Sequence, residues 1–153
     1  MSEMSVFEFA DKLHEIMPVI IKEFVRRQEK ELYKGKITIT QFLILDFLHR
    51  RKESKMKTLA DFMGVSTAAM TGMVDRLIRH AYVTRKFDPR DRRIIKIQLN
   101  SKGSELVEKI SQKRRQMIVK IFGKISSQER ADYLRILQRI YEVLTGKTEA
   151  QPK

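Results

Sequence analysis

The sequence contains no cysteine and no tryptophan, and it has only six glycines and three prolines among its 153 residues. Without cysteine the chain can form no disulfide, no thiolate zinc site and no cysteine redox switch. Its three histidines, His14, His49 and His80, stand far apart and show no metal-ligand spacing. The sequence also has no glycine-rich phosphate loop and no nucleophile motif. These absences argue against an enzyme, and they predict neither a metal nor another cofactor.

Long hydrophobic runs are also missing. No apolar stretch approaches the roughly 18 residues that a membrane-spanning helix needs. The first residues are acidic and amphipathic, which is not typical of a signal peptide. We therefore expect a soluble cytoplasmic protein with no membrane partner. Apolar residues make up 42% of the chain, enough for a packed core, and the length suits one domain.

Positive charge is abundant, and it is unevenly placed. The formal net charge is +13. Residues 1–39 hold as many acidic as basic side chains, so the excess lies entirely in residues 40–153. A basic surface of this kind attracts polyanions through phosphate neutralisation and counterion release. Charge alone, however, fits a merely soluble basic surface as well as a nucleic-acid-binding one.

The N-terminal segment predicts a long amphipathic helix. From Val6 to about Tyr33, apolar residues recur at three- and four-residue spacing on one face. Pro18 lies inside this stretch and lacks an N–H group, so it should kink or divide the helix. Gly35 should then end the helix as its C-terminal cap.

A second helix is expected to begin at Thr40, an acceptable N-cap. Residues 42–48 are apolar on most sides, which predicts a buried central helix. The polar run at residues 49–55 is expected to end it as a solvated loop or helix end, with at most a minor role in phosphate contact.

The next segment predicts a helix-turn-helix pair. Thr58 should cap a short helix over residues 59–63, and Gly64 permits the positive φ of a tight turn. Ser66 should cap a longer helix over residues 67–80, about 21 Å long at 1.5 Å per residue. The first residues of this helix are small or carry hydroxyl groups, which lets the helix backbone approach DNA closely. An ordinary helix hairpin whose small residues only allow packing is the alternative.

A β-hairpin is expected directly afterwards. Apolar and polar residues alternate over residues 83–87 and again over residues 95–99, on both sides of a six-residue polar loop. The loop contains three arginines and two aspartates. The aspartates can hold neighbouring arginines in place and leave at least one guanidinium free for a narrow minor groove. A self-satisfied, salt-bridged turn is the alternative.

Residues 64–103 together resemble the DNA-binding core of the MarR family of winged helix-turn-helix regulators. The wing of that family has the form D-x-R-D-x-R, matched here by Asp88, Arg90, Asp91 and Arg93. A T-x-x-G motif usually follows, and here Asn100 replaces the threonine before Gly103. Asn is also a good N-cap, so the departure changes little.

The resemblance implies a mainly α (α+β) fold over a single domain of residues 1–153. A winged helix-turn-helix core with a two-stranded wing would occupy residues 40–100, and residues 1–35 and 101–146 would form a helical dimerisation region. It also implies a homodimer on a roughly palindromic operator of double-stranded DNA. The expected DNA-binding residues are Thr40, Ser66, Thr67, Ala68, Ala69, Thr71, Gly72, Arg76, Arg90, Asp91, Arg92 and Arg93.

Arg93 is our choice for the minor-groove arginine, with Arg90 and Asp91 organising the wing around it. Many family members carry a longer side chain at the position of Gly72. Direct base readout should then be sparse, and specificity should depend on Thr71, Arg76, the wing and DNA shape.

A dimer can also be argued from the terminal helices. A helix is expected from Ser101 to about residue 122, and Ser126 and Glu129 have capping-box spacing for a last one. The apolar faces of the N- and C-terminal helices are too extensive to be buried against a small core. Packing across a two-fold axis would cover them. An intramolecular three-helix cluster is the alternative. The expected dimerisation residues are Val6, Phe9, Leu13, Ile16, Leu134, Leu137, Tyr141 and Leu144.

The function expected from these patterns is a sequence-specific transcriptional regulator, and the resemblance implies a ligand-responsive repressor. By the resemblance, a small aromatic or anionic effector would bind between the dimerisation helices and the core. Phe9, Leu13, Phe24 and Phe47 are candidates to line that crevice, although plain packing would also explain them. A non-specific architectural nucleic-acid-binding protein is the alternative function. The operator, the target genes, the effector and the sign of regulation are not encoded in any motif.

Overall fold

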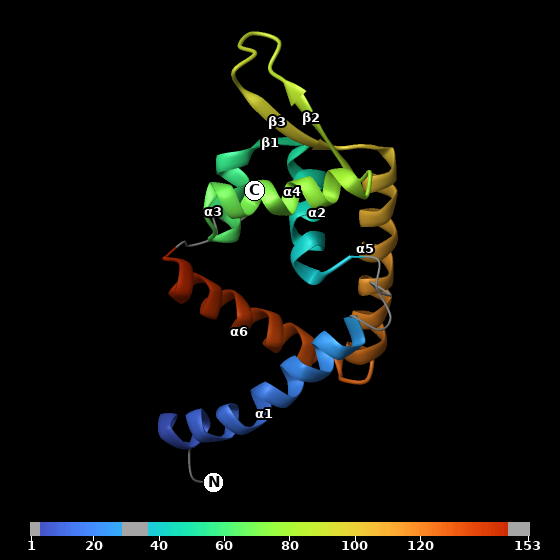
Figure 1. The fold of residues 1–153 in the computed structure, drawn as a ribbon. Helices are drawn as coiled ribbons and strands as arrows, with labels where there is room; N and C mark the ends of the chain where they lie inside the picture. Colours follow the sequence, from blue (N-terminus) through green and yellow to red (C-terminus); the bar gives the residue numbers. More distant parts are fainter. Residues whose placement is uncertain (1–3, 29–36, 147–153) are drawn as a thin grey trace, which may run out of the picture. The chain divides into compact units, whose positions relative to one another are not determined.

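The computed structural model describes residues 4–28 and 37–146 and is mostly helical, with one small antiparallel sheet (Figure 1). The chain forms two compact units, residues 1–114 and 115–153. Within the first unit, residues 37–114 build the predicted winged helix-turn-helix arrangement, so the mainly helical fold class with a wing is confirmed. The predicted helix end near Tyr33 and the predicted cap at Gly35 lie outside the described residues.

The buried central helix is α2 (Ile39–Arg51), and its start corrects the predicted cap. Thr38, not Thr40, is the N-cap. The Thr38 side chain accepts from the Gln41 N–H, and the Gln41 side chain accepts from the Thr38 N–H. A capping box needs Glu or Gln three residues after the cap, and Leu43 follows Thr40 at that spacing. Thr40 is therefore an exposed residue of the first turn.

A third strand was not predicted. Residues 53–55 form β1 (Glu53–Lys55), which pairs antiparallel with the second wing strand. The expectation of a solvated loop or helix end over residues 49–55 was wrong there, because pairing with a distant strand overrides the local polarity. Ser54 of this strand is 7% exposed. The sheet order is β1-β3-β2, with β2 (Val83–Phe87) and β3 (Ile95–Leu99) forming the predicted hairpin.

The helix-turn-helix pair consists of α3 (Met56–Met63) and α4 (Thr67–Arg79). Helix α3 begins earlier than expected, and Thr58 lies inside it rather than at its N-cap. The N-cap is Lys55, whose side chain makes no capping bond. Gly64 adopts the predicted positive φ, at 64°. Ser66 caps α4 as predicted, accepting a hydrogen bond from the Ala69 N–H at 3.1 Å.

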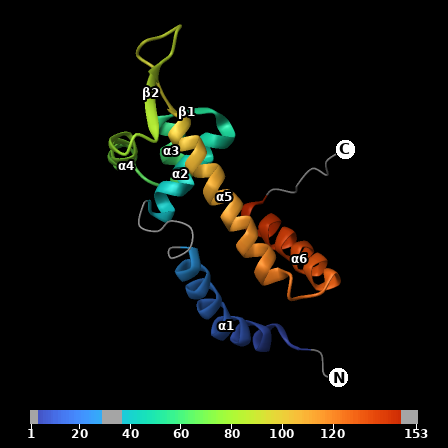
Figure 2. The ribbon, with the colours of Figure 1, turned by 90° about the vertical axis from the view of Figure 1, so that its right-hand side faces the viewer.

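The core of the winged unit lies where α2, α3, α4, the sheet and the start of α5 (Ser101–Phe122) meet. The sheet projects its outer hairpin beyond these helices (Figures 1 and 2). The largest fully buried side chains are apolar and come from each of these elements: Phe42, Ile44, Leu45, Leu48, Leu59, Met70, Val74, Leu77, Val83, Ile97, Val107 and Ile110.

The junction between the wing and α5 explains the expected N-x-x-G motif. The Asn100 side chain accepts from the Gly103 N–H at 2.9 Å and donates to the Ala81 carbonyl oxygen at 2.6 Å. A Cβ at Gly103 would lie 2.1 Å from the Tyr82 carbonyl oxygen. Only glycine fits this crossing, so the motif joins the end of α4 to the start of α5.

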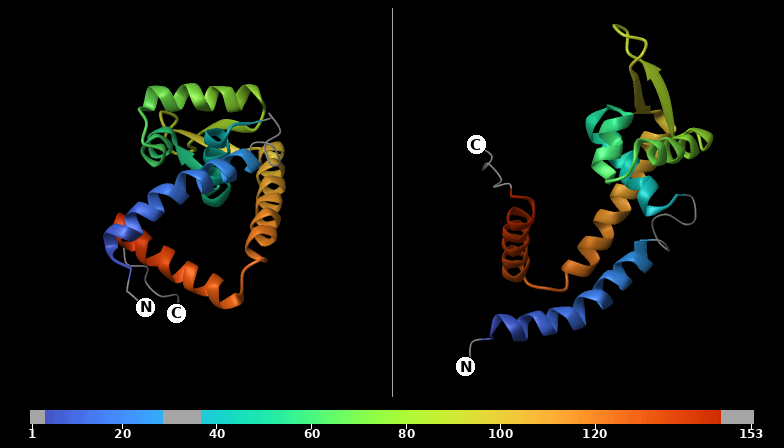
Figure 3. Two further views of the ribbon diagram at one scale, coloured as in Figure 1. Left: turned by 90° about the horizontal axis from the view of Figure 1, so that it is seen from below. Right: turned by 60° about the vertical axis from the view of Figure 1, so that its left-hand side comes forward.

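The first and last helices carry apolar side chains that their own units leave exposed. Helix α1 (Val6–Arg27) is one continuous helix, so Pro18 does not divide it, although its ribbon curves (Figure 3). Helix α6 (Ser127–Thr145) begins with the predicted capping box of Ser126 and Glu129. Neither helix contains a buried residue.

Two helix ends share one backbone motif but not one residue type. After α3, the Val65 and Gly64 N–H groups donate to the Ala60 and Asp61 carbonyl oxygens, with Gly64 left-handed. After α4, Tyr82 and Ala81 donate to Leu77 and Ile78 in the same way. There the left-handed residue is Ala81, with φ 58°. Helices commonly end in this manner with glycine, because a Cβ disfavours positive φ.

We expect Ala81→Gly to raise the free energy of unfolding by about 1 kcal/mol, because it removes a left-handed alanine at a small entropic cost in the unfolded chain. Gly64→Ala is the matched reverse change and should lower the free energy of unfolding by a similar amount. A Cβ there would meet no heavy atom within 4 Å, so the positive φ is the source of the cost. Urea denaturation of both variants measures the effect. A destabilised Ala81→Gly variant would contradict this account.

Candidate nucleic-acid interface

Helix α4 presents a shallow, polar face on the side away from the core. Met70, Val74 and Leu77 are buried, which turns the opposite face outward. The exposed residues on that side and at the cap are Ser66, Thr67, Ala68, Ala69, Gly72, Arg76 and Arg79. All of them except Arg79 belong to the predicted DNA-binding set. The face combines small residues that allow close approach with two long cations, Arg76 and Arg79.

Two residues of α4 qualify that description. The Thr71 side chain is only half-exposed, and its hydroxyl donates to the Thr67 carbonyl oxygen at 2.9 Å. Its lone pairs stay available as acceptors. At Gly72, a Cβ would meet no heavy atom within 4 Å. Packing within the described residues therefore does not require glycine there, and the position is open surface.

Hydrogen bonds that its two aspartate side chains accept from backbone N–H groups organise the wing loop. The Asp88 carboxylate accepts from the Arg90 N–H at 2.9 Å, and the Asp91 carboxylate accepts from the Arg93 N–H at 3.0 Å. The loop closes where the Asp88 N–H donates to the Ile94 carbonyl oxygen at 2.9 Å. Residues 88–94 thus form a seven-residue connection, one residue longer than predicted, with a defined backbone.

The charged groups of the loop pair differently from each other. Asp91 binds the Arg93 side chain, with its Oδ1 3.1 Å from Arg93 Nε, while 92% of the Arg93 side chain stays exposed. Asp88 pairs with Lys96 of β3 at 3.1 Å rather than with an arginine side chain. Within the described part of the chain, the guanidinium groups of Arg90 and Arg92 make no ion pair. The predicted free guanidinium is therefore present.

Both aspartates stay ionised at neutral pH. The Arg90 N–H and, next, the Lys96 ammonium lower the pKa of Asp88 below its usual value. The Arg93 side chain and then the Arg93 N–H lower the pKa of Asp91. Hydrogen bonds to the charged form of a carboxyl group have this effect. Protonation would remove the acceptors that shape the loop, and the lowered pKa values keep that event below the ordinary carboxyl range.

An ion pair that the sequence patterns did not predict ties the wing to α4. Arg85 Nη2 of β2 lies 2.5 Å from Asp75 Oδ1 of α4. The two residues are ten positions apart, with a helix end and a turn between them. The alternation of β2 places Arg85 on the same face as buried Val83. That placement was the sequence signal from which a contact between Arg85 and the helix could have been predicted. The pair is a direct side-chain link between the helix and the hairpin.

The end of α4 is anchored from α5. Lys102 Nζ donates to the His80 carbonyl oxygen at 3.1 Å and lies 4.9 Å from the centre of the Tyr82 ring. Asn100 binds the next carbonyl, that of Ala81. Cations suit helix C-termini, where carbonyl groups lack helical partners. Both ends of α4 are therefore held before any ligand binds.

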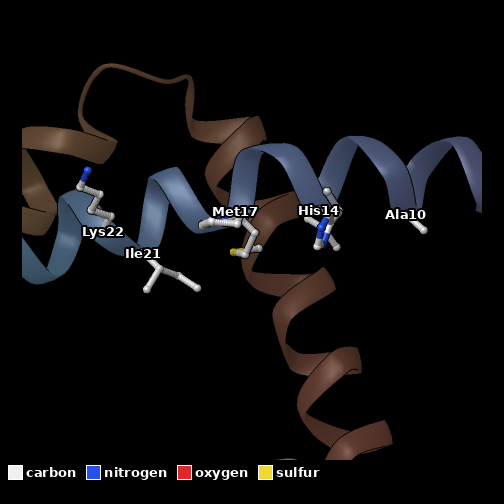
Figure 4. Close-up of a pocket in the computed structure, with 7 residues that line it drawn as sticks. Ala10, His14, Met17, Ile21 and Lys22 are labelled. Carbon is white, nitrogen blue, oxygen red and sulfur yellow. The ribbon is translucent and has the colours of Figure 1, made fainter.

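The structure does not gather the predicted crevice residues into one site. A shallow groove runs along α1 and is lined by Ala10, Leu13, His14, Met17, Pro18, Ile21 and Lys22 (Figure 4). It includes Leu13 but not Phe9, Phe24 or Phe47. Phe47 lies elsewhere, with its ring centre 4.3 Å from that of Phe62 on α3. Every lining residue comes from one helix, so the groove is open rather than enclosed.

Every predicted dimerisation residue is exposed within its own unit. The smallest exposed fraction is 40%, at Leu13 and Leu137, and the largest is 80%, at Val6. The described residues also lack any group of three or more His, Asp or Glu that could hold a metal ion. None of the helices described in residues 4–28 and 37–146 is long and apolar enough to cross a bilayer.

Comparison with known proteins decides the family. The sequence model of the MarR family matches residues 37–95, from the start of the winged unit into β3. A solved structure described as a MepR-like protein complexed with pseudoligands is 32% identical, covers 93% of this chain and 97% of its own, and has a TM-score of 0.56. The chain belongs to the MarR family.

Further relatives of this MarR-family protein agree. YhbI of Bacillus subtilis (strain 168), described as an uncharacterized HTH-type transcriptional regulator, is 29% identical over 136 residues, covering 89% of this chain and 87% of its own. Streptococcus pneumoniae FabT, solved in complex with DNA, shares the fold at a TM-score of 0.82 with 20% identity, covering 90% and 98%. The protein is a DNA-binding transcriptional regulator, and its relatives are regulators rather than enzymes.

We expect the Asp75–Arg85 pair to couple wing and helix in DNA binding. Both side chains are about 40% exposed, so a double-mutant cycle with alanine should give only about 0.2–1 kcal/mol of coupling in unfolding. The same cycle should be clearly non-additive in DNA affinity, because either single change already removes the side-chain link between β2 and α4. The Arg135–Asp132 pair on α6 is the matched control, and additive DNA affinities for Asp75 and Arg85 would refute the coupling.

Proposed function

We propose that this MarR-family protein acts as a homodimeric, ligand-responsive repressor on a roughly palindromic operator. The observation that carries the proposal is the pairing of an exposed α4 face with a pre-organised wing whose guanidinium groups face solvent. Residues 1–153 would then work as one functional domain. A regulator of this kind works on the chromosome, so a cytoplasmic location fits the proposal.

Helix α4 is suited to a major groove. Its thirteen residues span about 20 Å, and its outer face offers backbone, hydroxyl and guanidinium groups. Ser66, Thr67, Ala68 and Ala69 would approach phosphates and base edges first, because they lie at the N-terminal end. Helix N-termini favour phosphate oxygens. Thr40, exposed in the first turn of α2, would add a phosphate contact at most.

Sparse base readout follows from the size of these side chains. Ala68, Ala69 and Gly72 cannot reach far into a groove, which leaves Arg76 and the Thr71 acceptor as the base-contacting candidates. The wing would supply the remaining DNA contacts by inserting Arg93 into a narrow minor groove, where the negative electrostatic potential attracts arginine. Specificity would therefore depend strongly on DNA shape.

Dimerisation would cover the apolar faces of α1 and α6. Two-fold symmetry places the same patch of each subunit against its copy, so one interface would cover the exposed apolar faces of both helices. The dimer would set the spacing of the two α4 helices. Half-sites should lie about 34 Å apart or a multiple of that distance.

The proposed ligand response would use the groove on α1. A MepR-like relative has been solved with pseudoligands, which is a property of that protein. In this chain, the groove on α1 offers apolar side chains beside His14 and Lys22, a combination suited to an aromatic or anionic effector. An effector that favours one spacing of the α4 helices would shift the dimer away from its operator.

Fragments selected from random or genomic DNA would define the operator and its symmetry. Titration against that duplex and a scrambled one at two salt concentrations then tests specificity. A repressor keeps a large preference for its operator at physiological salt, whereas an architectural protein binds both duplexes alike and loses both together. Equal affinities for the two duplexes would favour the architectural alternative.

Arg93→Ala is expected to weaken operator binding by roughly 1–3 kcal/mol without changing the fold, because it removes the guanidinium assigned to the minor groove. Fluorescence anisotropy on the selected duplex measures the loss. Arg135→Ala is the control, since Arg135 also pairs with a nearby aspartate but lies on α6. Unchanged affinity in an intact dimer would remove Arg93 from the site.

Leu137→Asp or Tyr141→Asp should break the dimer and lower operator affinity with it, because each buries a charge in the proposed interface. Analytical ultracentrifugation gives the oligomeric state. Gln138→Asp makes the same change in charge at an exposed position beside the stripe and should leave the dimer intact. A still dimeric, fully binding Leu137→Asp variant would exclude α6 from the interface.

A further inference from the structure

Three lysines stand in one row across the sheet. The register pairs Lys55 of β1 with Lys96 of β3, and Lys96 in turn with Lys86 of β2. Directly opposite residues of antiparallel strands project from the same face of a sheet. The neighbouring row, which includes buried Ser54 and Ile97, projects inward. The lysine row therefore occupies the outer face.

The middle lysine is neutralised within the protein. Lys96 Nζ lies 2.5 Å from Glu53 Oε1 and 3.1 Å from Asp88 Oδ2, and three quarters of its side chain is covered. The Glu53 carboxylate and, next, the Asp88 carboxylate raise the pKa of Lys96 above its usual value. Lys96 thus joins the edge strand to the wing loop, which is a structural role.

The outer two lysines have no such partners. Lys55 and Lys86 are exposed, and in the described residues neither side chain makes a hydrogen bond or an ion pair. Both carboxylates of this face are already engaged by Lys96. Like charges placed opposite one another destabilise a sheet. The face is therefore left with a positive excess that nothing within the described chain balances.

The excess lies next to the wing. A hollow on this face is lined by Glu53, Lys86, Phe87, Asp88, Pro89, Arg90 and Lys96, which brings the free cations Lys86 and Arg90 together beneath the loop. A hairpin that enters a minor groove has a phosphate backbone on either side. Cations on the outer face of its strands are placed to meet one of those backbones.

We propose that Lys55 and Lys86 form a second DNA-backbone contact on the outer face of the sheet, extending the interface from the wing to the edge strand β1. This inference rests on the proposed operator binding. The contact is to phosphate, so it strengthens binding to any duplex and adds no base preference. It also assigns opposite roles within one row, with Lys96 holding the sheet and its two neighbours holding DNA.

Salt dependence of binding tests the assignment, because removing one lysine–phosphate interaction lowers the slope of log K against log salt by about 1. We would measure the wild-type protein, Lys55→Gln, Lys86→Gln and the double variant on the selected operator and on its scrambled form. Because the proposed dimer carries each lysine twice, each single change should lower the slope by about 2 and the double change by about 4, equally on both duplexes. Lys109→Gln, at an exposed position on α5, controls for net charge and should keep the wild-type slope.

Circular dichroism would confirm that every variant is folded. Unchanged slopes for Lys55→Gln and Lys86→Gln, in a protein that still prefers its operator, would overturn this inference and leave the repressor proposal standing. The same holds if Lys109→Gln lowers the slope as much, because the effect would then be one of overall charge. A wild-type protein without operator preference would instead remove the proposed function.

Discussion

The burial of Ile97 in the middle strand is the constraint on which the winged unit depends. Ile97 is fully buried, paired on one side with Ser54 and on the other with Arg85. A strand with neighbours on both sides cannot shift register without exposing this side chain. The same register fixes where Arg85 meets Asp75 and where the lysine row falls. Wing position, helix position and charge pattern therefore follow from one packed residue and its two partners.

Electrostatic pairing divides the charged residues of the winged unit into two groups. Asp75 and Glu53 each bind one cation, and Asp88 and Asp91 each bind a cation and a backbone N–H group, so these four residues shape the surface. The cations left over, among them Arg90, Arg92, Lys55 and Lys86, lie around the wing. An acidic minority that organises a basic majority gives a polyanion a rigid surface to bind. Composition gives only the net charge of the chain, whereas the structure shows which cations are paired and which are left unpaired around the wing.

Shape and charge divide the work of recognition in the function we propose. The outer face of α4 is smooth because Ala68, Ala69 and Gly72 are small, and an open position at Gly72 shows that packing within the described residues did not impose this. Affinity would come from cations on the wing and sheet, and selectivity from the few groups that reach bases. The exposed apolar stripes on α1 and α6 would make that arrangement dimeric.

Several features were determined by the sequence because their causes are local. The Gly64 turn, the Ser66 and Ser126 caps and the alternation of the wing strands each depend on residues within a few positions of one another, and all were confirmed. The resemblance in residues 64–103 also indicated the family, because its motifs lie in continuous sequence. The predicted DNA-binding, dimerisation and crevice residues stay predictions.

Only the tertiary structure decided the remaining features, because they join residues distant in the chain. Strand β1 is three polar residues that become a strand through pairing with the distant strand β3, in which Ser54 lies opposite Ile97. The Asp75–Arg85 pair and the lysine row depend on that same sheet register. Local pattern even misplaced the caps at Thr40 and Thr58, since the competing cap at Thr38 and the pairing of residues 53–55 outweighed them. Sequence thus specified the elements, whereas long-range packing specified which charges are free to meet DNA.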